Sequence, residues 1–144
     1  LSFFETAVRN LRERGIEVIV HTILGLPGES QEDILATMKY LNHRDIQGIK
    51  IQLLHVLKDT DLAQEYLEGK FHVYEREEYL NLVIRCLENL DPEIVIHRMT
   101  GDGPEKLLLA PLWTGRKREV LNLLHHQMKV CDSWQGKQFH SLPE

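Results

Sequence analysis

The amino-acid sequence predicts an α/β fold in which three parallel strands alternate with helices. Short β-branched runs are separated by longer runs that place apolar residues at helical spacing. Strands separated by helices pair in parallel through right-handed crossovers. Three strands are too few to close a barrel, and each open edge exposes unpaired backbone groups. The chain therefore looks like part of a larger fold.

The elements follow one another in a βα order. The first helix is expected to begin at a capping box of Ser2 and Glu5 and to end at Gly15. Ser30 is placed to cap the second helix. A polar segment, 132–144, is expected to be a flexible tail after a folded part over 1–131. The strands are expected at 17–24, 48–54 and 93–97, and the later helices at 31–43, 61–68, 75–90 and 116–131.

The composition is that of an ordinary globular domain. The chain has 144 residues, of which 42% are apolar and 27% charged, and its net charge is −5. These values exclude a disordered tail, and no apolar run approaches the roughly 20 residues of a membrane-spanning helix. Cys86 and Cys131 lie outside any C-x-x-C pattern, so they supply neither a disulfide framework nor a metal site. No signal peptide is visible, and we expect a cytoplasmic protein.

The most informative segment is the turn after the first strand. Gly25-Leu26-Pro27-Gly28-Glu29 joins this strand to the helix capped by Ser30. Glycines at 25 and 28 remove the β-carbon, so the backbone can approach a ligand closely, and the helix start favours anionic groups. A plain tight βα turn is an equally good interpretation of this spacing.

This segment resembles a known motif. Ile23 to Glu29, after a strand, is similar to the fifth-strand motif of radical S-adenosylmethionine (SAM) enzymes, in the version shared by coproporphyrinogen-oxidase-like and elongator-catalytic-subunit-like proteins. The family pattern is G-x-I-x-G-x-x-E, whose isoleucine packs on the SAM adenine. Ile23 and Gly25 match it, His21 replaces the first glycine, and the glutamate falls one place late at Glu29.

Two further segments carry the same resemblance. The run 53–60 is similar to the end of the sixth strand, whose backbone lines the adenine pocket, which implicates Leu54, His55 and Val56. The runs 96–102, 110–113 and 120–122 resemble the C-terminal region of an uncharacterised bacterial group of this family. The resemblance implies that residues 1–131 form the C-terminal half of a radical SAM (βα) barrel with a helical extension.

The resemblance also implies a chemistry. Radical SAM enzymes hold a [4Fe–4S] cluster on a C-x-x-x-C-x-x-C loop and reduce SAM by one electron to a radical that abstracts hydrogen from a substrate. Cys86 and Cys131 are too far apart in the sequence to form that loop. The cluster is therefore expected upstream of Leu1, and this segment alone is expected to be inactive. The implied partners are the upstream half of the barrel, a reductant and a substrate, with RNA and cofactors as substrate classes, since some relatives act on tRNA.

Polar residues on the predicted strands suggest a substrate side. Residues alternate between the faces of a strand, so the face of Ile23 also holds His21. In the next strand the same parity directs Lys50 and Gln52, together with Leu54, inward. Lys50 and Gln52 would need polar surroundings there, because burying them unpaired costs several kcal/mol. Solvent exposure of this pair, and a hydrogen-bonded core position for His21, are the alternatives.

The loop after the third strand completes the predicted site. Arg98 and Asp102, beside two glycines, suit a polar or phosphorylated substrate, whereas an Arg98–Asp102 pair that fixes the loop is the alternative. The basic run 115–118 is either an RNA contact or a solvated helix start.

Other functional classes remain open. One is a nucleotide- or phosphate-binding βα module without radical chemistry, and another is a non-catalytic interaction domain. The unpaired edge of strand 17–24 also predicts self-association of this segment.

Overall fold

The computed structural model describes residues 1–140 and shows three parallel strands in one sheet, in the order β1-β2-β4. The register pairs Ile19 with Gly48, and Gly48 with Val95. The parallel α/β fold predicted from the sequence is therefore confirmed. The strands are β1 (Ile19–Leu24), β2 (Gly48–Leu53) and β4 (Val95–Arg98).

Two strands begin later than the sequence predicts. Before β1, the Val18 N–H donates to the side chain of Gln47 at 2.7 Å, outside any regular ladder. Before β4, Pro92 lies in a turn in which the Ile94 N–H donates to the Asp91 carbonyl. In both places the apolar run continues past the point at which backbone pairing begins.

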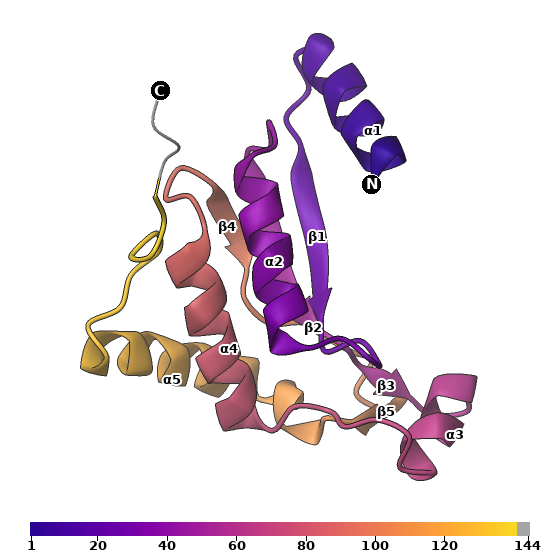
Figure 1. Ribbon diagram of the computed structural model, residues 1–144. Coiled ribbons are helices and arrows are strands. Elements are labelled where there is room, and N and C mark those ends of the chain that lie inside the picture. The colour runs from indigo at the N-terminus through magenta and orange to yellow at the C-terminus, as the bar shows by residue number, and fades with distance from the viewer. Residues whose placement is uncertain (141–144) are drawn as a thin grey trace.

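Helices cover one face of the sheet, as Figure 1 shows for α2 and α4. Ile49 and Ile51 of β2 are fully buried on this side, in one core with Met38 and Tyr79 of the helices. Within residues 1–140 no helix covers the opposite face. None of the helices in this range is both long and apolar enough to cross a membrane. The helices are α1 (Ser2–Glu13), α2 (Gln31–Asn42), α3 (Asp61–Leu67), α4 (Arg76–Asn89) and α5 (Lys117–Val130), with a 3₁₀ turn, η1 (Leu112–Gly115).

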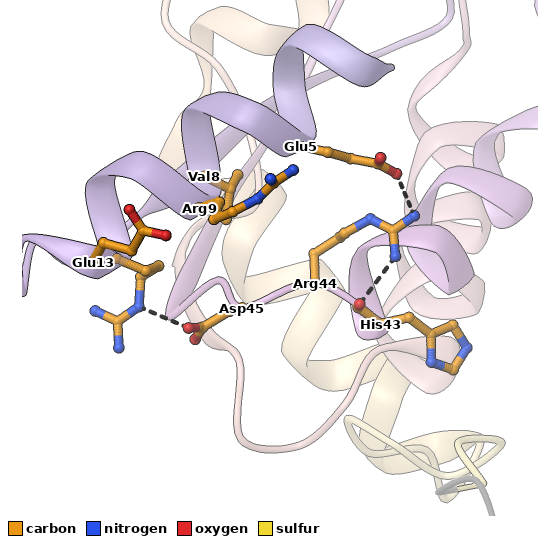
Figure 2. A pocket seen from close by; sticks show the side chains of 8 residues that line it. Glu5, Val8, Arg9, Glu13, His43, Arg44 and Asp45 are labelled. Carbon is orange, nitrogen blue, oxygen red and sulfur yellow. Dashed lines mark hydrogen bonds and ion pairs between the residues drawn. The ribbon is translucent and has the colours of Figure 1, made fainter.

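The first helix lies beside β1 and is held by polar contacts. The capping box predicted for Ser2 and Glu5 is wrong, because Ser2 is already helical and the Glu5 carboxylate turns toward α2. It accepts hydrogen bonds from the Tyr40 hydroxyl at 2.9 Å and from Arg44 at 2.7 Å. An open groove of about 700 Å³ lies between α1 and the end of α2. Figure 2 shows the side chains that line it, with Arg44 reaching toward Glu5. Side chains of both charges line this groove on both segments, and the ion pairs between them hold α1 against the sheet layer.

A second, smaller unit was not predicted. The strands β3 (Val56–Leu57) and β5 (Leu108–Ala110) pair antiparallel next to α3, and Figure 1 shows them beyond the end of the main sheet. Val56, Ala63 and Ala110 form its buried centre. Strands of two and three residues are too short to produce a recognisable alternation, which explains why the sequence did not show them.

The segment 132–144, for which we predict a flexible tail, is described at residues 132–140, which lie against α4; 141–144 fall outside the described residues. The Gly136 N–H donates to the Leu87 carbonyl at 2.9 Å, and the Gln135 amide donates to the carbonyls of Asp91 and Ile94. The first bond is to a carbonyl in the last turn of α4, and the other two are to carbonyls in the connection between α4 and β4.

Candidate functional site

The uncovered face of the sheet carries a row of basic side chains. The strand register places His21 next to Lys50, and Lys50 next to Arg98. Residues 49, 51 and 53 of β2 are buried beneath the helices, so Lys50 and Gln52 lie on the other face. Arg98 Nη1 donates to Gln52 Oε1 at 3.4 Å. Four of the five residues predicted on the substrate side thus come together.

His97 belongs to the same surface, although the sequence did not single it out. Its ring lies against Gly48, where an added Cβ would be 2.6 Å from His97 Cδ2. Simple alternation would place His97 and Arg98 on opposite faces. The register shift between Ile49 and Lys50 lets both side chains reach the uncovered face. An irregularity of this kind leaves no trace in the residue pattern.

The row is electrostatically unbalanced. Within residues 1–140, neither Lys50 nor Arg98 forms an ion pair with a carboxylate, whereas most surface arginines of the chain do. The whole protein has a net charge of −5, so this positive row stands out against an acidic background. A sheet face of this kind attracts anionic ligands.

Asp102 forms its ion pair with Lys117 and not with Arg98. Its carboxylate accepts a hydrogen bond from Lys117 of α5 at 2.9 Å, and this bond lowers the pKa of Asp102. Arg98 contributes only a weaker, longer-range attraction. The alternative of an Arg98–Asp102 pair that fixes the loop is therefore wrong, and Asp102 instead ties the loop to α5. Arg98 therefore does not hold the loop through Asp102.

His55 lies at the carboxyl end of the sheet, enclosed by the β4 loop. Its Nδ1 is 3.0 Å from the Leu53 carbonyl, and its ring fits between Gly101 and Gly103. Because a carbonyl only accepts, Nδ1 carries the proton in this contact and Nε2 is an acceptor. Nε2 is buried without a hydrogen-bond partner, as is the Thr100 hydroxyl. Within residues 1–140, these two polar atoms are thus buried without a hydrogen-bond partner at this edge.

The glycine turn after β1 is closed from within. The Glu29 carboxylate folds back and accepts the N–H groups of Gly25 at 3.2 Å and Leu26 at 3.3 Å. Gly25 has φ +88°, and an added Cβ would be 2.8 Å from the ring of Tyr74. At Gly28, with φ +82°, an added Cβ would have no neighbouring atom within 4 Å. The Tyr74 ring thus fills the space that the missing β-carbon leaves at Gly25, whereas the corresponding space at Gly28 is open.

The other residues predicted for a cofactor differ in their accessibility. Ile23 is 43% exposed on the uncovered face, beside Gln52 in the register. Leu54 follows β2 directly, and its N–H donates to the Leu24 carbonyl at 2.9 Å. The Val56 side chain is fully buried in the small unit of β3 and β5, so it faces away from the edge. Of these residues, Ile23 is the one with an exposed side chain.

The described residues do not fit an iron–sulfur cluster. Residues 1–140 contain no group of three cysteine, histidine, aspartate or glutamate side chains that suits a metal ion. Cys86 is buried in α4, and this burial raises the pKa of its thiol to about 12. Cys131 is exposed beyond the end of α5. A cluster needs several close thiolates, which these two do not supply.

The fold is that of a partial βα barrel, with three parallel strands and helices on one face of the sheet. Residues 46–130 match the radical SAM C-terminal domain, and the chain belongs to this family. The uncharacterized protein YtqA of Bacillus subtilis is 42% identical over 137 residues, which cover 95% of this chain and 42% of YtqA. The chain thus spans about two fifths of the length of this relative.

More distant proteins extend the relationship. The tRNA uridine(34) acetyltransferase of Dehalococcoides mccartyi is 29% identical over 124 residues, which are 84% of this chain and 27% of that enzyme. Among solved structures, Elp3 of the archaeon Methanocaldococcus infernus matches 91% of this chain and 32% of its own, with a TM-score of 0.72. At 20% sequence identity, this likeness supports the α/β fold alone.

Proposed function

We propose that this chain is the C-terminal segment of a radical SAM enzyme, in which it binds the adenosine part of SAM and forms one wall of the substrate cavity. Membership of the radical SAM C-terminal domain family supports the enzyme class. The observation that carries the proposal is the shared carboxyl edge, where the Gly25 turn follows β1, His55 follows β2, and the loop after β4 encloses His55 with Gly101 and Gly103. Ligands of βα barrels bind at this edge.

The cofactor side of the proposal uses Ile23, Gly25, Leu54, His55 and Val56. The exposed Ile23 side chain offers an apolar contact for the adenine ring. The segment 54–56 contributes backbone groups, and His55 Nε2 adds a hydrogen-bond acceptor. SAM, when bound together with a [4Fe–4S] cluster, supplies radical abstraction of hydrogen. The residues of this chain bind SAM and orient it.

The remaining half of the barrel completes the enzyme in this proposal. The upstream part of the protein supplies the cluster ligands and a strand that pairs with β1, which is an edge strand in this sheet. A reductant docks on the intact enzyme. Where that upstream half is missing, the free edge of β1 leads to self-association.

The substrate side uses His21, Lys50, Gln52 and Arg98, with Asp102 as a loop anchor. Their positive row fits an anionic substrate, and we propose RNA. The relative that is named a tRNA uridine(34) acetyltransferase supports this class of substrate. The Lys50 and Arg98 side chains would contact phosphate groups, because no carboxylate of the described chain neutralises them.

A phosphate-binding module without radical chemistry is the second candidate, since the same basic row favours it. A purely structural interaction domain has less support, because it would need no polar side chains on this face.

Binding measurements on the full-length protein test the substrate side. Lys50→Met is expected to weaken RNA binding and to reduce the slope of log affinity against log salt by about one, which corresponds to one lost phosphate contact. Lys39→Met, which removes an exposed lysine of α2 on the opposite layer, is the matched control. Equal losses for both variants would contradict a specific role for Lys50.

Anaerobic reconstitution tests the cofactor side. The full-length protein is expected to take up about four irons per chain and to bind SAM, whereas residues 1–144 alone bind neither. A full-length protein that binds RNA but neither iron nor SAM would favour the phosphate-binding module. A cluster assembled on residues 1–144 alone would contradict the division of labour between the two halves.

A further inference from the structure

Three aromatic side chains contact one another and two segments of the site, the Gly25 turn and the start of the loop after β4. Tyr74 comes from the connection between α3 and α4, Tyr79 from α4, and Trp113 from η1. We call them the aromatic anchor. Trp113 lies in the run 110–113 that resembles the family, but nothing in the sequence indicates that the three side chains meet.

The first contact of the aromatic anchor reaches the glycine turn. The ring of Tyr74 covers Gly25 so closely that a β-carbon there would be 2.8 Å from Cε2 and 3.0 Å from Cδ2. On the other side of the turn, the Glu29 carboxylate holds the N–H groups of Gly25 and Leu26. The turn is thus fixed between a ring and a carboxylate. Burial, and the nearby charge of Glu29, raise the pKa of Tyr74, so its ring stays neutral.

The second contact reaches the β4 loop. Tyr79 is fully buried, and its hydroxyl donates to the Met99 carbonyl at 2.7 Å. Met99 directly follows Arg98, which belongs to the basic row. The Tyr79 hydroxyl therefore fixes the backbone at the point from which Arg98 extends.

Trp113 joins these two contacts. Its indole N–H donates to the Tyr74 carbonyl at 3.0 Å. Its ring packs on Tyr79, with centroids 5.5 Å apart and an interplanar angle of 41°. A tilted arrangement of this kind is a favourable aromatic contact. Through Trp113, the residue that covers the glycine turn is connected to the residue that holds the β4 loop.

We propose that Tyr74 and Tyr79 are positioning residues of the site, and that Trp113 couples them so that the Gly25 turn and the Arg98 loop are ordered together. The inference rests on the proposed function only where it names SAM and RNA as the ligands of these two segments. The placement of the segments themselves follows from contacts within the chain. Tyr74 acts through its ring, whereas Tyr79 acts through its hydroxyl.

This difference gives a sharp experiment on the full-length protein. Hydrogen–deuterium exchange is measured for peptides that contain Gly25 and Leu26, or Thr100 and Gly101. Tyr74→Ala is expected to speed exchange in the first peptide, and Tyr74→Phe to restore it. Tyr79→Phe is expected to speed exchange in the second peptide by about fivefold, the factor for one lost hydrogen bond. Trp113→Leu is expected to affect both peptides.

Ligand binding provides the second measurement. Tyr74→Ala is expected to weaken SAM binding by about tenfold and to leave the iron content unchanged, because displacement of binding groups by about 1 Å has effects of this size or larger. Tyr79→Phe is expected to weaken RNA binding and to leave SAM binding within about twofold.

Tyr66→Ala is the matched control, since Tyr66 packs on Phe71 in the small unit around α3, away from the aromatic anchor. Exchange that rises equally for this variant and for Tyr74→Ala would overturn the proposal. So would a Tyr79→Phe variant with an unchanged β4 loop. Wild-type protein that fails to bind SAM would refute the proposed function instead, and the exchange pattern would still decide the roles of the two tyrosines.

Discussion

Replacement of Gly25 by alanine separates two costs that the structure assigns to this position. Gly25 has φ +88°, a conformation that L-residues rarely adopt, and its missing β-carbon leaves room for the Tyr74 ring. Gly28 has nearly the same backbone angle, φ +82°, but no atom within 4 Å of its β-carbon position. Gly28→Ala therefore measures the backbone cost alone, and Gly25→Ala measures both costs.

The magnitudes follow from these two environments. The left-handed conformation costs an alanine about 1–2 kcal/mol. A β-carbon that overlaps a packed ring costs about 1–3 kcal/mol more, as overpacked side chains do. Gly28→Ala is thus expected to lower the free energy of unfolding by about 1–2 kcal/mol, and Gly25→Ala by about 2–5 kcal/mol.

Urea unfolding of the single variants and of Gly25→Ala combined with Tyr74→Ala tests this reasoning. Once the ring is gone, Gly25→Ala should cost only about 1–2 kcal/mol, because only the backbone term remains. The two substitutions should therefore be coupled by about 1–3 kcal/mol in a double-mutant cycle. Additive effects of Gly25→Ala and Tyr74→Ala, or equal costs at Gly25 and Gly28, would refute the contact between the ring and the turn.

Three further predictions concern other parts of the molecule. A thiol reagent should label the exposed Cys131 rapidly and Cys86 only after unfolding, because Cys86 is buried and its thiol pKa is raised to about 12; a Cys131→Ser variant that is labelled in the native state would contradict this. The pKa of Asp102 is lowered by Lys117, so this contact stabilises the fold fully above the ordinary value of 3.8 and is lost as the pH falls through the lower folded value. Acid unfolding curves should therefore be less steep for Asp102→Asn in that range, and identical curves would show that the contact does not contribute. Light scattering over a wide concentration range should show self-association of residues 1–144, since β1 is an edge strand with Ile19 and Ile23 exposed. A mass that stays at one chain throughout would count against a free edge.

The sheet could be predicted from the sequence because its signals are local and repeated. Short β-branched runs gave the three strands, and the helices between them required parallel pairing. Alternation then placed Lys50 and Gln52 on the side away from Ile49 and Ile51, which the structure confirms. The same parallel order brings the Gly25 turn and the loop after β4 to the edge of His55, whereas Arg98 lies level with Lys50 inside the sheet and not at that edge as predicted.

The features that were missed depend on contacts between distant segments. Tyr74 lies in a connection without periodicity, so nothing local indicates that its ring covers Gly25. The register shift that aligns Arg98 with Lys50, beside His97, arises from pairing with β2. Glu5 was assigned to a helix cap, since no local pattern shows that Tyr40 and Arg44 compete for its carboxylate. The polar composition of 132–140 likewise concealed its bonds to α4.

The alternation along β2 has a consequence for how such a protein can change. Ile49, Ile51 and Leu53 hold the strand to the helices, while Lys50 and Gln52 meet the outside between them. Replacing Lys50 and Gln52 leaves the three apolar residues in place, together with the stabilisation that their burial contributes. New ligand preferences can therefore arise by exchanging every other residue of a strand, without rebuilding the layer that keeps the strand in place.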